Sequence, residues 1–397
     1  MTVLDDARSM NDDLVDLRRR LHRVPELGLE LPHTQETVLA ALDGLPLDIT
    51  TGTSSTSITA VLRGNGATKR TVLLRGDMDA LPVHERTGLD YASDGDTMHA
   101  CGHDLHTTML VAAARLLSAR RDQLDGDVVF MFQPGEEGYD GARHMVEEGV
   151  LDAAGPRVDA ALALHVTSAF LPAGVFATRP GPVMSAADVL RVTVHGTGGH
   201  GSAPHRARDP IPAACAMVTA LQTMVTRRYD VFDPVVVTVG VIGGGTAHNV
   251  IPDTAFFEAT VRSFSGAAHA RILEDTVAVC RGIAAAHGVD VDAVASELYP
   301  VTVNNGNEVN GLRDVVHELH GEPRWVQLPN PLTGSEDFSR VLDAVPGAIA
   351  FLGACLPERN PETAAYNHSP EAAFDDAVLA DGAAVYAEWA LHRLGQA

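Results

Sequence analysis

Residues 98–108 read MHACGHDLHTT and place three histidines, one cysteine and one aspartate within eleven positions. Thiolate and imidazole side chains are ligands that Zn²⁺ and neighbouring first-row cations accept. Residues two apart cannot share a helix face, so the spacing predicts Cys101 and His103 in an extended loop before a helix at 105–121. Short His and Cys clusters also occur in ordinary cores. A metal site therefore requires further ligands elsewhere in the chain.

Further candidates stand at the ends of three continuous apolar runs of the kind that buried parallel strands require. The runs are 71–79, 127–132 and 159–166. Polar residues close each run, namely Asp77 and Asp79, then Glu136 and Glu137, then His165. The carboxyl ends of parallel strands line the ligand crevice of an open α/β sheet. With His368 of YNHSP, these segments favour a metal site over a set of ordinary core residues.

The middle of the chain has a different pattern from the two ends. It predicts the order strand, helix, strand, strand, helix, strand: 188–196, 210–226, 235–245, 254–264, 266–287 and 289–297. This order is the split βαβ arrangement. We therefore expect an α/β domain from 1–184 and 301–397, interrupted by an α+β domain at 185–300. The α/β domain resumes with a helix at 308–320, a strand at 348–353 and a helix at 371–394.

Composition narrows the class of protein. The 397 residues suit two domains, and 29 basic against 52 acidic residues give a formal net charge of −23. Such a balance argues against nucleic acid and anionic membranes as partners. No run approaches the roughly 18 apolar residues of a membrane span, and the N-terminus has no apolar signal segment. Four cysteines without paired spacing favour the cytoplasm.

Nine motifs then occur in an order and at spacings typical of one family. They are RGDMDALP, HACGHDLHT, QPGEEG, ALHV, GTGGHGSAPH, AHNVIPD, TVRSF, GSEDF and NHSP. The chain resembles the binuclear-metal aminoacylase/carboxypeptidase metallohydrolases, in the amidohydrolase branch of hippurate hydrolase and indoleacetyl-amino-acid hydrolase. The resemblance runs from residue 17 to the last helix. It implies a catalytic α/β domain with a mostly parallel sheet, and an inserted ferredoxin-like domain that serves as a lid or dimerisation domain. A homodimer or homotetramer is therefore expected.

The resemblance also assigns roles in the catalytic domain. It implies two divalent ions per chain, Zn²⁺, Mn²⁺, Co²⁺ or Ni²⁺, held by Cys101, His103, Glu137, His165 and His368. Glu136 matches the general base beside two cations that polarise a water and the scissile carbonyl. Asp79 matches an acid that orients a ligating histidine. Asp77 stands where relatives outside the branch place a histidine ligand; Cys101 compensates for it, so Asp77 is not expected to bind metal.

In the inserted domain the resemblance points to three residues. It implies that His200, often from a partner subunit, stabilises the charge on the carbonyl oxygen. Asn249 and Arg262 match positions that hold the substrate's backbone and carboxylate, and the planar fork of arginine suits a carboxylate. The chain departs from the usual pattern at Thr197, Gly76, Tyr139 and Asp140. These departures concern substrate preference, because none removes a ligand or the base.

The expected activity is hydrolysis of the amide bond of N-acyl amino acids, with Glu136 as general base. A dipeptidase or carboxypeptidase acting on small peptides is the alternative, because the same water attacks any amide. A cysteine hydrolase built on Cys101 and His103 leaves the other metal-site residues without a role. A non-catalytic binding module would have lost a ligand or the base, and the chain keeps both.

Overall fold

The computed structural model describes residues 2–66 and 70–395, which divide into two compact units. Unit 1 takes in the described residues of Met1–Val183, Val303–Asn330 and Asp337–Ala397. Unit 2 consists of Met184–Thr302 and Pro331–Glu336. The insertion predicted at 185–300 lies within unit 2. That unit also includes Pro331–Glu336, which the sequence pattern placed in the catalytic domain.

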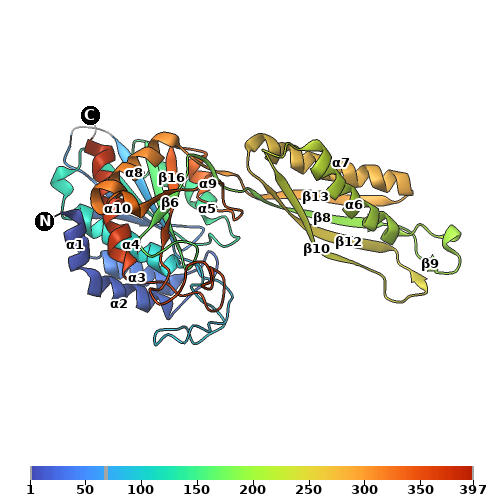
Figure 1. Ribbon diagram of the computed structural model, residues 1–397, viewed down its shortest axis with the longest axis horizontal. Helices are drawn as coiled ribbons and strands as arrows, with labels where there is room; N and C mark the ends of the chain where they lie inside the picture. The colour runs from blue at the N-terminus through green and yellow to red at the C-terminus, as the bar shows by residue number, and fades with distance from the viewer. Residues whose placement is uncertain (1, 67–69, 396–397) are drawn as a thin grey trace. The chain divides into compact units, whose positions relative to one another are not determined.

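Unit 1 is built on an eight-stranded sheet (Figure 1). In spatial order its strands are β1 (Leu47–Thr51), β2 (Ile58–Leu62), β4 (Asp127–Gln133), β3 (Thr71–Asp77), β5 (Ala160–Thr167), β16 (Gly347–Gly353), β6 (Phe176–Thr178) and β15 (Trp325–Gln327). The central strands β4, β3, β5 and β16 pair in parallel, whereas β1, β2 and β6 make antiparallel pairings. The α/β class with a mostly parallel sheet is thus confirmed.

Strands β3 and β16 are buried along their whole length, and β4 and β5 are buried at every position except Asp127 and His165, as their continuous apolar sequences predicted. The helices of unit 1 are α1 (Val3–Ser9), α2 (Asn11–His22), α3 (Pro32–Leu42), α4 (His103–Ser118), α5 (Gly141–Glu147), α8 (Gly306–His320), α9 (Ser339–Leu342) and α10 (Val378–Gly395). Helix α4 is buried at every position except Arg115 and Ser118, because β3, α2 and α10 all pack against it. An Ala- and Leu-rich helix is suited to this central place.

Three helix starts differ from the sequence-based expectation, and the smallest change is at α8, which begins at Gly306 instead of residue 308. Helix α4 begins at His103 instead of residue 105, so Cys101 lies in the loop but His103 does not. The helix starts there because Gly102 takes φ 83° and its carbonyl oxygen accepts hydrogen bonds from Leu105 N and His106 N. Helix α10 begins at Val378 instead of residue 371. Before it, Phe374 makes an isolated β-bridge with Cys355, residues 376 and 377 form a turn, and the Asp375 carboxylate accepts a hydrogen bond from Ala377 N.

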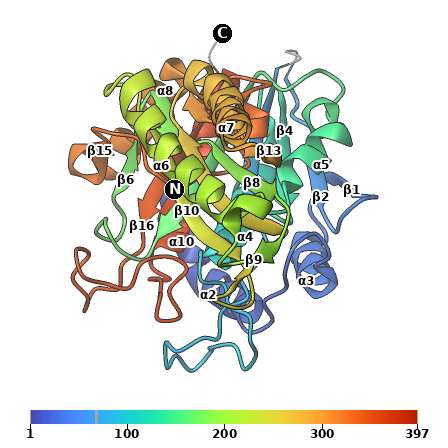
Figure 2. The ribbon, with the colours of Figure 1, turned by 90° about the vertical axis from the view of Figure 1, so that its right-hand side faces the viewer.

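Unit 2 has the predicted order of elements: β8 (Ala187–His195), α6 (Pro210–Arg228), β10 (Val235–Gly244), β12 (Thr254–Ser263), α7 (Gly266–His287) and β13 (Asp290–Tyr299). The strands form an antiparallel sheet in the order β10-β12-β8-β13. Residues of β12 alternate between exposed and buried, because α6 and α7 cover one face of the sheet (Figure 2). Leu190, Phe257 and Ile272 lie in the core between sheet and helices.

Short ribbons complete the structure. β9 (Gly199–His200) pairs with β11 (Val250–Ile251), and β7 (Gly181–Met184) pairs with β14 (Thr302–Asn304). Among the described residues, no helix combines the length and apolar character that crossing a membrane requires.

Candidate metal centre

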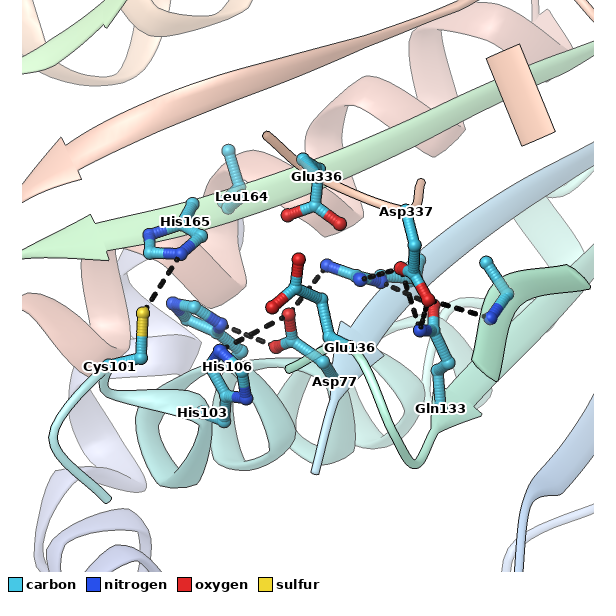
Figure 3. A network of polar contacts seen from close by, with 12 residues as sticks. Asp77, Cys101, His103, His106, Gln133, Glu136, Leu164, His165, Glu336 and Asp337 are labelled. Carbon is cyan, nitrogen blue, oxygen red and sulfur yellow. Dashed lines mark hydrogen bonds and ion pairs between the residues drawn. The ribbon is translucent and has the colours of Figure 1, made fainter. Parts of the chain in front are cut away.

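The carboxyl ends of three neighbouring parallel strands bring the predicted ligands together in unit 1 (Figure 3). Strand β3 ends at Asp77, β5 carries His165 near its end, and the turn after β4 carries Glu136 and Glu137. The first residue of α4, His103, faces the same place. This is the edge at which parallel sheets bind ligands.

Cys101 lies at the middle of the cluster. Its Sγ is 3.5 Å from His165 Nε2 and 3.3 Å from His368 Nε2. His368 Nε2 is also 3.1 Å from Glu137 Oε1. Hydrogen bonds from His368 to Cys101 and Glu137 raise the pKa of His368 to about 10, because they favour its positively charged form. The same surroundings favour a bound cation.

His103 is fully buried among carboxylates. Its Nδ1 lies 3.4 Å from Asp79 Oδ1, and its Nε2 lies 3.6 Å from Asp77 Oδ2 and 4.0 Å from Glu137 Oε1. Neither ring nitrogen makes a hydrogen bond to the described residues. Burial lowers the pKa of His103, but the surrounding acids outweigh burial and raise it well above its usual value. A buried imidazole without a hydrogen bond is costly unless another group, such as a metal, binds it.

Asp79 organises the turn that carries the two glutamates. Its Oδ1 and Oδ2 accept hydrogen bonds from Glu136 N and Glu137 N, each at 3.0 Å. The turn also needs Gly135, which adopts φ 73°. Glu136 is 6% exposed, and an oxygen of each glutamate lies within 4.8 Å of a ring nitrogen of His103. Burial raises the pKa of Glu137, but His368 and His103 outweigh it and lower the pKa.

Beneath these groups, Asp77 belongs to a layer of buried hydrogen bonds. It accepts from Arg75 Nη1 at 2.7 Å, and its Oδ1 lies 2.6 Å from His106 Nδ1. Burial raises the pKa of Asp77, but Arg75 and the two histidines hold it well below its usual range. His106 Nε2 accepts a hydrogen bond from Val166 N at 2.7 Å. Both Asp77 and His106 thus have hydrogen-bond partners, although Asp77, His103 and His106 also lie close enough to share an ion.

The donor set fits a pair of divalent cations. Cys101, His103 and His165 lie close enough to share one ion, and so do Cys101, Glu137 and His368. Thiolate, imidazole and carboxylate are ligands for zinc and its neighbours in the first transition row. The buried nitrogens of His103, which have no hydrogen bond among the described residues, support the same interpretation.

In unit 2, His200 and Asn249 lie on neighbouring segments of the β9–β11 ribbon. His200 pairs with Val250, and Gly201 N donates to Asn249 O at 2.8 Å. His200 is exposed, and its Nδ1 accepts a hydrogen bond from Ser202 N at 3.2 Å. Because a backbone N–H can only donate, the ring proton of neutral His200 is on Nε2. His200 is therefore a hydrogen-bond donor through Nε2.

Arg262 lies on the four-stranded sheet of unit 2, near the end of β12. β12 begins at Thr254, which pairs with His195, and Arg262 is eight residues further along. This corresponds to about 26 Å at about 3.3 Å per residue. The β9 ribbon follows His195 and lies beyond the end at which β12 begins (Figure 1). Unit 2 thus keeps Arg262 apart from His200. Arg262 is half-buried, and its Nη1 donates to Ser335 Oγ at 3.1 Å.

Each departure from the family pattern has structural contacts. Asp140 adopts φ 56° and binds Arg340 through both carboxylate oxygens at 3.2 and 3.1 Å. The Tyr139 ring lies against Gly28, where an added Cβ would be 3.1 Å away. A Cβ on Gly76 would lie 2.9 Å from His106 O, so glycine allows α4 to pack closely on β3. Thr197 pairs with Arg208 through backbone hydrogen bonds in both directions.

Some residues of the centre were not predicted from the sequence. Asp337 of GSEDF accepts hydrogen bonds from Arg75, Gln133 and Ala142 N, and so supports the layer below the ligands. Asn367 hydrogen-bonds to the segments of Cys101 and His165. Both lie inside quoted motifs, but a motif alone does not say which of its polar residues turn inward.

Comparisons with known proteins agree with this geometry. Residues 73–392 match the peptidase family M20/M25/M40. The chain is 36% identical to thermostable carboxypeptidase 1 of Saccharolobus solfataricus, over 96% of both chains, and 34% identical to hippurate hydrolase of Campylobacter jejuni, over 99% and 100%. A crystal structure from Bacillus subtilis, described as a dinuclear metal binding peptidase from the M20 family, superposes with a TM-score of 0.83. It shares 30% sequence identity, over 98% of this chain and 100% of that chain.

These matches confirm the resemblance inferred from the motifs. The chain belongs to the peptidase family M20/M25/M40 and is a metal-dependent amide-bond hydrolase.

Proposed function

We propose that this protein removes the acyl group from N-acyl amino acids. The main support is the convergence of five donor side chains from four segments beside the buried carboxyl group of Glu136. Cys101, His103, Glu137, His165 and His368 are the proposed ligands of two divalent cations per chain, Zn²⁺, Mn²⁺, Co²⁺ or Ni²⁺. Both groups of three donors include Cys101, so Cys101 would contribute to holding both ions. Bound cations of this kind polarise a carbonyl and lower the pKa of water.

The chain's own side chains then complete the reaction. Glu136 takes a proton from the attacking water and delivers it to the leaving nitrogen as general base and then general acid. Asp79 holds the backbone of Glu136 and lies beside His103 Nδ1, which leaves Nε2 of His103 for metal. His200 donates its Nε2–H to the carbonyl oxygen as negative charge develops there.

The substrate's amino acid part would be recognised through its carboxylate. Arg262 offers a planar pair of donors to this group. Asn249 is the proposed contact for the substrate backbone. Arg262 and His200 of one unit lie too far apart to contact the same small substrate. We therefore propose that His200 and Asn249 act on the site of a neighbouring chain, in a homodimer or homotetramer in the cytoplasm. Unit 2 would then serve as the lid and dimerisation domain.

Hydrolysis of dipeptides or removal of C-terminal residues is the second candidate, because a relative that matches over 96% of both chains is named a carboxypeptidase. A panel that pairs N-acetyl and N-benzoyl amino acids with dipeptides of the same C-terminal residue separates the two activities. Higher kcat/KM for the acyl series supports the proposal, and higher kcat/KM for dipeptides favours the alternative.

The same panel tests the metal requirement. A chelator should abolish turnover, and Zn²⁺, Mn²⁺, Co²⁺ or Ni²⁺ should restore it. Full activity in chelator, with no tightly bound metal by elemental analysis, would favour a cysteine hydrolase and reject the proposal. Substrate analogues with a C-terminal amide test Arg262, because they should lose kcat/KM in the wild type but little in Arg262→Ala.

A further inference from the structure

Asn367 joins the three segments that carry Cys101, His165 and His368. Its Nδ2 donates to Val166 O at 3.0 Å and to Cys101 O at 3.2 Å, and lies 3.7 Å from Cys101 Sγ. Its Oδ1 accepts from Ser168 N at 2.9 Å. The side-chain amide thus contacts Cys101 and the backbone on both sides of the C-terminal end of β5.

The orientation of this amide is determined by its partners. Ser168 N can only donate, so the oxygen of Asn367 must face it. The carbonyl oxygens of Val166 and Cys101 can only accept, so the nitrogen must face them. An asparagine is therefore required on electrostatic grounds, since a carboxylate would place an oxygen against two carbonyl oxygens.

The backbone beside Asn367 is strained. His368 adopts φ 71°, a left-handed conformation that residues other than glycine rarely take. Two contacts hold it there: the Asn367 side chain and the hydrogen bond from His368 N to Ala100 O at 2.9 Å. Strain of this kind persists only where the surroundings determine it, and here it directs the His368 ring at Cys101 Sγ.

We propose that Asn367 is a positioning residue that holds Cys101, His165 and His368 in the geometry required to bind metal. It touches neither substrate nor the reacting atoms and acts through the ligands. The inference rests on the proposed function only for the assignment of these three residues as ligands.

The test compares Asn367→Asp with Asn360→Asp, an identical change in the same loop. Asn360 is exposed, and its side-chain oxygen accepts a hydrogen bond from Glu362 N. Zn²⁺ affinity is measured by competition with a chelator, and the Co²⁺ form is examined for its thiolate-to-metal absorption band. We expect Asn367→Asp to weaken Zn²⁺ binding by about 10–100-fold and to change the Co²⁺ band. Asn360→Asp should bind Zn²⁺ like the wild type.

The added negative charge sharpens the comparison, because charge alone would tighten binding of a cation. Asn367→Ala, which removes the contacts without adding charge, should also weaken Zn²⁺ binding and serves if the aspartate variant does not fold. Wild-type Zn²⁺ affinity and an unchanged Co²⁺ band in the folded variants would overturn the inference. A lower Tm of the metal-free protein with unchanged Zn²⁺ affinity would overturn it too, because Asn367 would then stabilise the fold without positioning the ligands. A wild type that binds no metal would instead count against the proposed function.

Discussion

Among single residues, the contrast between His165 and His106 explains which histidine is available to metal. His165 Nδ1 lies 2.9 Å from Val166 O, and donation there leaves its Nε2 lone pair directed at Cys101 Sγ. His106 keeps its proton on Nδ1 for Asp77, but its Nε2 already accepts from Val166 N. In both rings the proton is on Nδ1. The difference lies at Nε2, because Val166 N donates to this atom in His106 and not in His165. Such outer contacts set the orientation and basicity of ligands.

Glu136→Gln should retain metal and fold but lose most turnover. The amide keeps the size of the side chain and cannot take a proton from water. A positioned general base contributes roughly 10²–10⁴-fold to kcat. Elemental analysis and steady-state kinetics on the same preparation check both halves of this prediction. Near wild-type kcat in the variant would show that another group is the base.

His22 makes stability depend on pH. It is buried, with Nδ1 2.7 Å from Asp104 Oδ2 and Nε2 3.2 Å from Glu85 Oε2. Burial lowers the pKa of His22, but Asp104 and Glu85 outweigh burial and raise it above 6.5. A raised folded-state pKa stabilises fully below the unfolded value and loses this effect as pH rises through the folded value. The wild-type free energy of unfolding should therefore fall above pH 6.5, by at most about 1.4 kcal/mol per pH unit.

The His22→Gln variant isolates this effect. Urea unfolding at several pH values between 6 and 9 should show a flatter profile for the variant, and the largest difference from the wild type at the lowest pH. Parallel profiles for the two proteins would show that His22 does not bind an extra proton in the folded state.

At the level of elements, the turn between Cys101 and α4 is set by Gly102. It adopts φ 83°, and a Cβ there would lie 2.4 Å from Val166 Cγ2. The turn places Cys101 outside the helix and His103 in its first position, so that both reach the same cluster. Gly102 thus allows Cys101 and His103, which are two residues apart in sequence, to reach the cluster from different directions.

Gly102→Ala should lower both metal affinity and stability. Gly44 is the matched control, because it adopts φ 76° and an added Cβ would have no neighbour within 4 Å. Gly44→Ala should lower the free energy of unfolding by only about 1–2 kcal/mol, the backbone cost of the left-handed conformation. Gly102→Ala should also displace Val166, whose backbone contacts His106 and His165. Zn²⁺ titration and urea unfolding of both variants test this. Equal losses in the two variants would show that the close contact with Val166 is unimportant.

Sequence patterns predicted elements well where one physical cause dominates. The apolar runs at 71–79 and 127–132 became β3 and β4, because only full burial permits such runs. The helix predicted from 371 begins at Val378, because local carboxylates and turns compete with helix formation there. The roles of Asn367 and Asp337 depend on contacts between segments far apart in sequence. A residue pattern does not encode such contacts.

For the whole molecule, the separation of Arg262 and His200 within unit 2 bears on the proposed substrate contacts. Arg262 lies about 26 Å along β12 from Thr254, the residue at which that strand begins. His200 lies on the separate β9–β11 ribbon, beyond the Thr254 end of β12. A small substrate held by Arg262 is therefore out of reach of His200 of the same unit 2. If both residues contact the substrate, two chains must contribute to each site. Activity would then require an assembled oligomer, even though all the proposed metal ligands belong to one unit 1.

Mixing two inactive variants tests this sharing of residues. His200→Ala should lower kcat by roughly 10²–10³-fold, the usual loss for one oxyanion donor, without changing metal content. Glu136→Gln should be inactive for a different reason, loss of the base. In a mixed dimer, the intact Glu136 of one chain meets the intact His200 of the other, so one of the two sites regains both residues. Subunit exchange, verified by mass spectrometry of differently tagged chains, should therefore restore partial activity. A site built within one chain would stay inactive in the same mixture, because no chain carries both residues. The result separates the two architectures directly, since exchange changes only which chains are neighbours.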